Sequence, residues 1–517
     1  MNLLHRRWIR RSLWALLSVA ALIVLLRVYV DWSGARQWRA VRAMLAREGQ
    51  PLDLRAAAYE PIPDAENFCA IPALKDLARA TIGGDENGEP EKKRARLLAA
   101  SLPLHGKAGA PPPLHGVAVG QRTDLKRWAA WFQENGSTAK SGDAARDVLS
   151  ALSKDDAMFE ELAGGLDRPE AQWTPAWKTR VFPLNLFEVT LPHYNCAQQM
   201  NRSLALRSIA AARAGDAPQA CQSAQIIARL SKACLEEPNL LGLLVAASGT
   251  ANLANITWEL SDAQAGTAED FGRLESALAG MDFRNGAWRA FSGELIGVAS
   301  TFQSAKQSAD LRRVFVGLDG LDSAAAQKAV AYMVPPGFFD ASTAVLADHE
   351  FRYFVKPLRD HGWQAALASA HEFDAELEVV KGTILTHPAY ILTGMVARVV
   401  PSVLVKAIYA QTLVNQAVIA CALERYRIEQ ERYPDSLDLV TPSGGKPLPK
   451  DILTGKPMSY RKTVNGKYAL WSVSFDGKDH GGQRALDKAH PEGTKVWKEN
   501  YAGDWVWDFP ERSLGGR

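Results

Sequence analysis

The sequence predicts a mainly α-helical protein with one N-terminal transmembrane helix, an extracytoplasmic multi-helix body and a small C-terminal α+β module. Three observations support this prediction: one long apolar run near the N-terminus, apolar residues at helical spacing over residues 123–431, and strand-type spacing after residue 432. The 517 residues are 47% hydrophobic and 23% charged, which is typical of soluble globular proteins. We therefore expect the chain beyond the apolar run to be soluble.

The apolar run covers residues 12–30 (SLWALLSVAALIVLLRVYV) and contains one charge, at Arg27. Its length matches the hydrocarbon core of one bilayer. Arginines at positions 6, 7, 10 and 11 precede it, which predicts a single-pass protein of the cell inner membrane with a cytoplasmic N-terminus and an extracytoplasmic body. Bulky residues occupy the place of a cleavage site, so we expect a retained anchor. A twin-arginine export signal at Arg10-Arg11 is the alternative.

Composition and spacing divide the chain into five parts. They are a basic tail and anchor (1–32), a stalk helix and Pro/Gly-rich linker (33–122), a helical body (123–382), apolar helices leading into the module (383–431) and the module itself (432–517).

The second part begins with a predicted stalk helix over residues 34–49, which Gly49 ends. Four prolines between residues 51 and 72 then predict an extended segment running over a surface. Residues 82–122 are rich in glycine, proline and charge, which predicts a disordered linker around a short helix from Arg94 to Ala100.

The body reads as one helix after another, with Asp124 and Asp143 as expected helix caps. Its clearest element is a helical hairpin that turns at Gly215-Asp216, with Pro218 in the first turn of the second helix. The hairpin is similar in form to one tetratricopeptide unit, but no second copy follows at the expected period. A true repeat array is therefore the less favoured reading.

Residues 383–431 form a second apolar region, which Arg398, Pro401 and Lys406 interrupt. Because no clean stretch is long enough to span a bilayer, we predict buried helices, the second from about residue 402 to 430. A re-entrant or membrane-surface role is the alternative.

The module begins where the spacing becomes strand-like. Residues 458–462 and 467–474 predict two strands joined at Asn465-Gly466. Near the C-terminus, Trp505, Trp507 and Phe509 alternate, which predicts a strand that buries one face or an aromatic edge for a partner.

This module resembles the C-terminal part of type II secretion major pseudopilins. There a long helix ends in a YxxxxxxYPxxL pattern, followed by LPxD, a short hairpin and a loop with Asp-Gly. The matching residues are Tyr426, Tyr433, Pro434, Leu437, Leu448, Pro449, Asp451, Tyr460, Leu470, Ser472, Asp476 and Gly477. Pseudopilins begin with a processed leader and a fibre-forming helix, whereas here the module follows a large body. We therefore do not expect an ordinary fibre subunit.

In that family the loop after the hairpin resembles a calcium site. The resemblance points to Asp476, Asp479 and Asp508 as candidate calcium ligands, since carboxylates on a glycine-rich loop suit a hard cation. A polar turn without metal is the alternative. No other cofactor is expected.

The whole chain also resembles, more loosely, uncharacterised single-pass membrane proteins of environmental bacteria. They share a PxPDxxNF segment, an HP-containing helical region and an ALERYR…YPxSL ending, which here begin at Pro61, His387 and Ala422. This resemblance implies an architecture and no activity.

No catalytic residue is predicted. The chain has no GxSxG, GxxxxGK[ST] or GxGxxG motif, and His349-Glu350 and His371-Glu372 do not extend to HExxH. The five cysteines lack metal-ligand spacing, and a Cys221–Cys234 disulfide stays an alternative to buried thiols. Sixty basic against 57 acidic residues give no reason to expect nucleic acid as a partner.

The expected function is therefore that of a non-catalytic, membrane-anchored envelope scaffold. Its expected partners are the bilayer, through residues 12–30, and other envelope proteins, with a secretion machine as one setting. The competing hypothesis is an extracytoplasmic hydrolase whose site is assembled from distant helices. A deep pocket of histidines and carboxylates would favour the hydrolase, and a shallow aromatic groove the scaffold.

Overall fold

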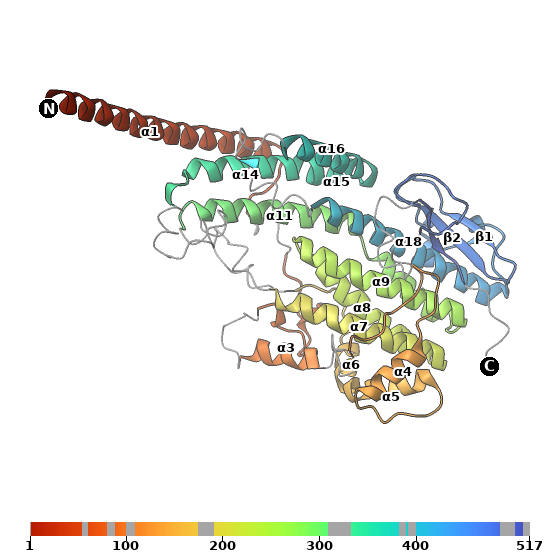
Figure 1. Cartoon of the computed structure of the whole chain (residues 1–517). Coiled ribbons are helices and arrows are strands. Elements are labelled where there is room, and N and C mark those ends of the chain that lie inside the picture. Colours follow the sequence, from red (N-terminus) through yellow and green to blue (C-terminus); the bar gives the residue numbers. More distant parts are fainter. Residues whose placement is uncertain are drawn as a thin grey trace.

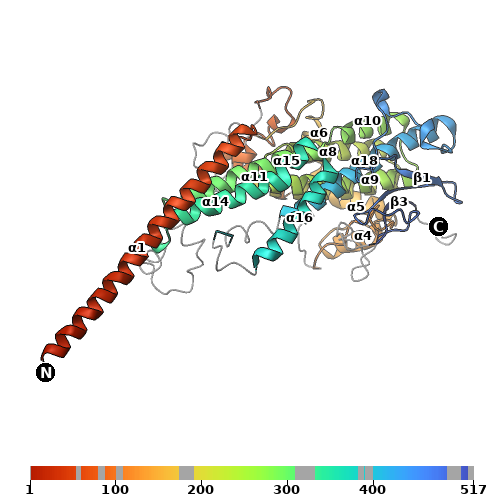
Figure 2. The same cartoon turned by 90° about the horizontal axis from the view of Figure 1, so that it is seen from above.

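The N-terminal apolar run lies within one long helix, α1 (Asn2–Arg47) (Figure 1). Its first half projects from the body with exposed apolar side chains, and its second half packs along α14 (Pro336–Glu350) (Figure 2). The predicted stalk helix is therefore a continuation of the helix that carries the apolar run, and it is part of the body. Gly34 allows this, because a Cβ there would overlap the carbonyl oxygen of Gly337.

The computed structural model describes residues 2–53, 60–79, 88–99, 109–173, 191–308, 332–381, 389–390, 400–485 and 502–509. Within these residues the protein is mainly helical, with a small antiparallel sheet near the C-terminus. The other helices are α3 (Glu89–Ala99), α4 (Leu125–Glu134), α5 (Ala144–Leu152), α6 (Asp156–Ala163), α7 (Pro192–Ala214), α8 (Ala217–Leu235), α9 (Leu240–Ala263), α10 (Ala268–Ala279), α11 (Phe283–Ala305), α15 (Lys356–Asp360), α16 (Trp363–Lys381) and α18 (Val400–Gln430).

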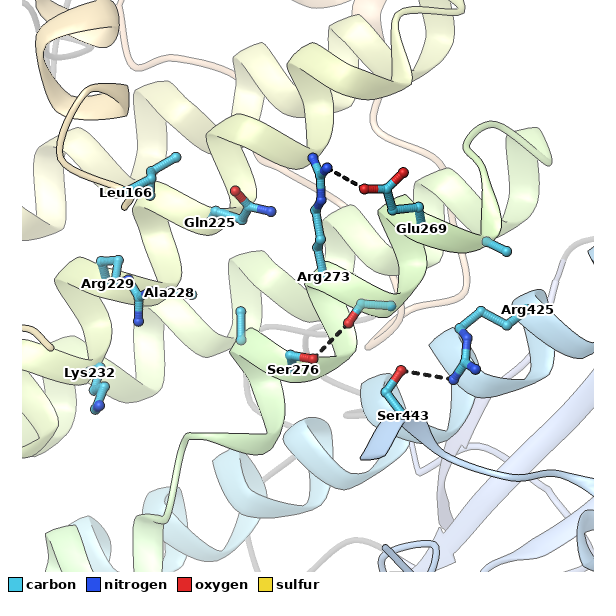
Figure 3. A pocket seen from close by; sticks show the side chains of 13 residues that line it. Leu166, Gln225, Ala228, Arg229, Lys232, Glu269, Arg273, Ser276, Arg425 and Ser443 are labelled. Carbon is cyan, nitrogen blue, oxygen red and sulfur yellow. Dashed lines mark hydrogen bonds and ion pairs between the residues drawn. The ribbon is translucent and has the colours of Figure 1, made fainter. Parts of the chain in front are cut away.

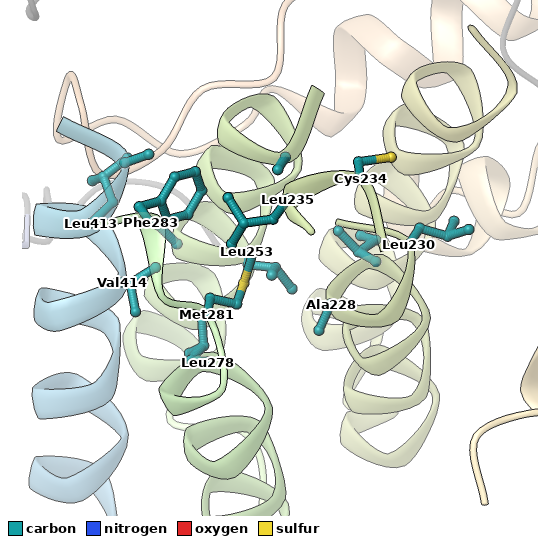
Figure 4. Close-up of a cluster of buried hydrophobic side chains, with 14 of the residues drawn as sticks. Ala228, Leu230, Cys234, Leu235, Leu253, Leu278, Met281, Phe283, Leu413 and Val414 are labelled. Carbon is teal, nitrogen blue, oxygen red and sulfur yellow. The ribbon is translucent and has the colours of Figure 1, made fainter. Parts of the chain in front are cut away.

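The helices stack in layers that Figure 1 shows from top to bottom. Helices α1, α14, α15 and α16 form the first layer, α11 and α18 the second, α7, α8 and α9 the third, and the short helices α3 to α6 the last. The main core lies where α8, α9, α10 and α18 meet, and Figure 4 shows Leu253, Met281 and Leu413 packed there. Burial of such side chains contributes roughly 1.5–3 kcal/mol each.

Local signals place the central helices as predicted. Gly215 ends α7 in the left-handed conformation at φ +84°, and the side chain of Asp216 accepts a hydrogen bond from the amide of Gln219 at the start of α8. Asp124 and Asp143 cap α4 and α5 in the same way. The predicted short helix of the linker is α3, and the adjoining residues 80–87 and 100–108 lie outside the described residues.

The proline-rich segment differs from its prediction. Residues 60–79 form short turns, and Phe68, Leu74 and Leu77 are buried in the main core instead of running over a surface. Asn67 holds the segment in place, because its side chain donates to the carbonyl of Gln172 (2.9 Å) and accepts from the amide of the same residue (2.8 Å). The prolines thus break the helix without excluding the segment from the core.

Helices α14 and α15 form one rod, joined by a π-helical turn at Phe351–Val355. The rod runs parallel to α1, because Gly337 donates its amide proton to Asp31 (2.7 Å) and Lys356 pairs with Glu48 (2.7 Å) farther along both helices. The body half of α1 is therefore attached at two levels.

The C-terminal sheet has strand order β1-β2-β3, all antiparallel, with β1 (Ser459–Lys462), β2 (Tyr468–Val473) and β3 (Asp504–Trp507). The predicted hairpin is confirmed, and so is the predicted third strand. Every residue of β3 is buried, so this strand buries both faces instead of one. Gln416 of α18 donates to the carbonyl of Trp505 (2.7 Å), which ties the sheet to the bundle.

Three described helices are long and apolar enough to cross a membrane: α1, α9 and α18. The apolar window of α1 is 0% buried, whereas that of α9 is 56% and that of α18 89% buried within the protein. Helix α18 is thus the buried helix predicted for residues 402–430. Residues 382–388 and 391–399, where the first helix of that region was expected, lie outside the described residues.

Candidate functional site

A groove of about 670 Å³ opens between α8, α10 and the end of α18 (Figure 3). We call it the basic groove. Its lining consists of Leu166, Gln225, Ala228, Arg229, Lys232, Ala268, Glu269, Gly272, Arg273, Ser276, Ala277, Arg425 and Ser443.

Helix α10 forms one wall because its amphipathic sequence buries one face and leaves the other toward the groove. A capping box between Thr267 and Asp270 starts the helix, and Phe271, Leu274 and Leu278 bury its inner face. The small residues of the outer face leave the groove open, and a Cβ on Gly272 would lie 3.6 Å from the hydroxyl of Ser443.

Buried Glu275 fixes the floor of the groove. It accepts hydrogen bonds from the amide of Ser443 (2.6 Å) and from the guanidinium of Arg425 (3.0 Å). Arg425 also donates to the hydroxyl of Ser443 (2.9 Å) (Figure 3). This network joins α10 and α18 to the turn before the sheet. The charge of Arg425 is thereby neutralised within the protein.

The other three cations of the groove differ in their partners. Arg273 pairs with Glu269 one turn earlier on the exposed face of α10, and Lys232 pairs with Glu170 at 2.7 Å. Arg229 donates to the carbonyl of Pro169 (2.8 Å), and within the described residues it forms no ion pair. Burial lowers the pKa of Arg229, and the nearby charge of Glu170, which acts in the opposite direction, offsets this only in part. An anion in the groove would supply that missing partner.

A second groove of about 450 Å³ adjoins the first, and Lys232 lines both. Its lining includes the carboxylates Glu60, Glu236 and Asp282. The surface therefore passes from a basic to an acidic stretch across Lys232.

The three candidate calcium ligands make bonds to protein groups instead. Asp476 lies 2.7 Å from the imidazole Nε2 of His480, Asp479 accepts from the indole of Trp471 (2.9 Å), and Asp508 pairs with Arg484. Within the described ranges, no group of three or more His, Cys, Asp or Glu side chains could hold a metal ion. The calcium site stays a prediction.

Several residues of the pseudopilin-like pattern hold the module together. Buried Asp451 accepts from the amides of Leu453 (2.8 Å) and Val473 (3.0 Å) and from the hydroxyl of Ser472 (2.8 Å). Tyr433 donates to buried Glu424 (2.6 Å), and Tyr460 donates to the carbonyl of Pro434 (2.8 Å). These contacts give the pattern a structural role.

Two histidine–carboxylate pairs join residues that are distant in the sequence, as the hydrolase hypothesis requires. His193 Nε2 lies 2.7 Å from Glu237, which also accepts from Tyr194, and His349 Nε2 lies 3.4 Å from Glu376. His193 is 0% and His349 5% exposed, and neither lines the two grooves described above.

Two further carboxyls, of partly buried Glu294 on α11 and buried Glu350 on α14, affect each other's charge. Glu350 is 2% exposed, and neither oxygen of its carboxyl has a hydrogen-bond partner. Burial raises the pKa of Glu294 to about 7. Burial and the charge of Glu294 together raise the pKa of Glu350 well above its ordinary range.

All five cysteines are free and buried. The alternative of a Cys221–Cys234 disulfide is therefore not realised in this structure. Burial raises the pKa of the Cys221 thiol to about 12 and also raises that of Cys234.

The cations of the basic groove were not predicted as site residues from the sequence. Arg229 and Lys232 lie one turn apart on α8, and such a pair on a polar helix face is an ordinary solvated surface. Arg273 and Arg425 line the same groove only because α8, α10 and α18 pack together, and this packing is not indicated by the local sequence.

Comparisons with protein-family models, with curated proteins and with solved structures found no match.

Proposed function

We propose that this protein is a non-catalytic, single-pass scaffold of the cell envelope. In this proposal α1 crosses the inner membrane through residues 12–30, the N-terminus is cytoplasmic, and the body lies outside the cytoplasm. The basic groove then holds an acidic segment of another envelope protein, and a secretion machine is the setting that the pseudopilin-like module suggests.

The observation that carries the proposal is the charge of the groove. Four cations line it. Three of them pair with carboxylates of the protein, whereas Arg229 forms no ion pair within the described part of the chain. Burial removes water from this guanidinium, and a carboxylate of a partner would compensate for the lost hydration. An Arg–carboxylate contact is both strong and directional.

The position of the groove supports a protein partner over a lipid headgroup. Helix α10 lies toward the end of the body opposite the N-terminus of α1 (Figure 2). If a bilayer surrounds residues 12–30, the groove lies away from the lipid and is open to other proteins in the same compartment.

The hydrolase hypothesis finds less support in the same geometry. Its requirement is a histidine and a carboxylate at a site that substrate can reach. The histidines of both long-range pairs are buried, although the side chain of Glu376 is 35% exposed, so a substrate would need a structural opening to reach either imidazole.

A binding experiment with a defined probe tests the groove. The full chain in mild detergent is titrated against a fluorescein-labelled peptide of alternating Glu and Gly, and anisotropy is read at low and high salt. We expect binding that salt weakens and that Arg229→Gln weakens about tenfold, equivalent to about 1.4 kcal/mol. Arg146→Gln, at a 72% exposed side chain of α5, is the matched control and should leave binding unchanged.

Equal loss with both variants would mean nonspecific charge attraction, and absence of binding would refute the acidic-segment proposal. A photo-crosslinker at Gln225 in native membranes then identifies the physiological partner. The crosslinked peptide should be rich in Asp and Glu, and Arg229→Glu should abolish the adduct. An adduct that survives the charge reversal would contradict the proposal.

A further inference from the structure

The chain just before α14 lies against α1 inside its apolar run. The guanidinium of Arg27 donates to the carbonyl of Met333 (3.1 Å) and to that of Tyr332 (3.4 Å). These residues are more than 300 positions apart in the sequence, so the contact fixes part of the body at a defined level of the anchor.

That level lies within the stretch expected in the bilayer. Arg27 lies three positions before the end of the apolar run at Val30, which is about 4.5 Å along a helix. Apolar side chains continue beyond Arg27, with Tyr29 62% and Trp32 55% exposed. With residues 12–30 in a bilayer, Tyr332 and Met333 would lie at the depth where hydrocarbon meets headgroups.

The side chains at this position suit such a depth. Tyr332 is 57% and Met333 71% exposed, which are large values for apolar side chains. The next residue, Val334, already packs against a separate small core that includes Phe302 and Phe339. Tyrosine is enriched at membrane interfaces, since its ring is apolar and its hydroxyl reaches water.

The backbone carbonyls at this position also have hydrogen-bond partners. Carbonyls without partners are costly near hydrocarbon, and Arg27 donates to two of them. One helical turn farther, Asp31 accepts from the amide of Gly337 (2.7 Å) at the N-terminus of α14, where a negative charge is favourable. The single charge of the apolar run thus has a partner on the body.

We propose that Tyr332 and Met333 form a second membrane contact, which rests in the interface of the bilayer leaflet on the body side. The inference depends on the proposed function, in which residues 12–30 of α1 span the bilayer. It adds that the body contacts the lipid surface just before the start of α14, where Arg27 of α1 is hydrogen-bonded to Tyr332 and Met333. Its partner is a phospholipid bilayer.

Depth-dependent fluorescence quenching tests this contact. The full chain carries an NBD label at one introduced cysteine and is reconstituted into vesicles of phosphatidylcholine and phosphatidylglycerol. Quenching is measured with lipids whose nitroxide lies close to the headgroup or deep in the acyl chain. The five native cysteines are buried, so the unmodified chain is the control for background labelling.

Three positions make the result interpretable. Leu22→Cys reports the middle of the apolar run, and Val464→Cys, 101% exposed at the β1–β2 turn, reports water. We expect Met333→Cys to be quenched most by the shallow nitroxide, Leu22→Cys most by the deep one, and Val464→Cys by neither. Arg27→Gln should reduce shallow quenching at Met333 and leave Leu22 unchanged.

The failures of the two proposals are distinct. Quenching at Leu22 without quenching at Met333 would overturn the second membrane contact and leave the anchor intact. Absence of quenching at Leu22 would overturn the anchor itself and with it the proposed function.

Discussion

The carboxyls of partly buried Glu294 and buried Glu350 predict that neutral pH destabilises this protein. In the folded chain burial raises the pKa of Glu294 from 4.5 to about 7, which corresponds to about 3 kcal/mol. Between these values the folded state holds a proton that the unfolded state has released. The free energy of unfolding must therefore fall as pH rises from about 4.5 to 7, and the loss is complete above the folded pKa.

Replacing Glu294 by Gln removes the titrating group at nearly constant size. Near pH 4.5 the variant should match the wild-type chain, and at pH 8 it should be more stable by up to about 3 kcal/mol. Glu350→Gln should act in the same direction, because its carboxyl has no hydrogen-bond partner to lose. Glu134→Gln, at an exposed position of α4, is the control and should change little at any pH.

The assay is unfolding of the full chain in mild detergent, followed by tryptophan fluorescence from pH 4.5 to 8. The informative quantity is the difference between variant and wild type at each pH, since other groups titrate equally in both. A difference that stays constant with pH, or that favours the wild type at pH 8, would refute the assignment of Glu294 and Glu350 as protonated in the native state.

Three further predictions concern packing, the module and calcium. Gly34→Leu should lower the thermal midpoint, because a side chain there overlaps the backbone of α14 and overpacking costs roughly 1–3 kcal/mol or more. The control Ala40→Leu, at an exposed position, should not lower it. Equal midpoints for the two variants would contradict the contact between α1 and α14. Asp451→Ala should destabilise the module by about 3 kcal/mol, because it leaves buried hydrogen-bond donors unpaired. The measurement is limited proteolysis, which should cut faster after α18. Unchanged proteolysis would argue against Asp451 as a structural residue of the module. Millimolar calcium should leave the thermal midpoint unchanged, because Asp476 and Asp479 accept hydrogen bonds from the protein; a rise that Asn at both positions abolishes would establish the calcium site.

Local features of the fold were predictable, because their causes lie within a few residues. The turn at Gly215 needs a positive φ and the next helix needs a cap at Asp216, and both residues are adjacent in the chain. The same holds for Asn465-Gly466, where Gly466 adopts φ +75° between the two strands. These elements formed where the sequence indicated.

Long-range features were not predictable from a single sequence. The basic groove needs Arg229 of α8 beside Arg425 of α18, nearly two hundred residues away, and neither position differs locally from a solvated helix face. The burial of Phe68 was missed for a related reason, since the prolines around it exclude helix and say nothing about burial. The candidate calcium ligands came from the resemblance to pseudopilins, and the ion pair of Asp508 with distant Arg484 is a contact that the sequence alone does not indicate.

The continuity of α1 decides how such a scaffold would present its groove. A flexible stalk would let the body turn freely above the bilayer, whereas here the helix that carries the apolar run continues to Arg47 and packs along α14. The part beyond residue 30 extends about 26 Å along its axis. It is attached near its start by Asp31 and just past its end by Glu48. Because both attachments lie on the same rod of α14 and α15, the anchor and the body should move as one unit. A partner held in the basic groove would then have its position and its orientation fixed relative to the membrane, which is what a scaffold of an envelope assembly requires.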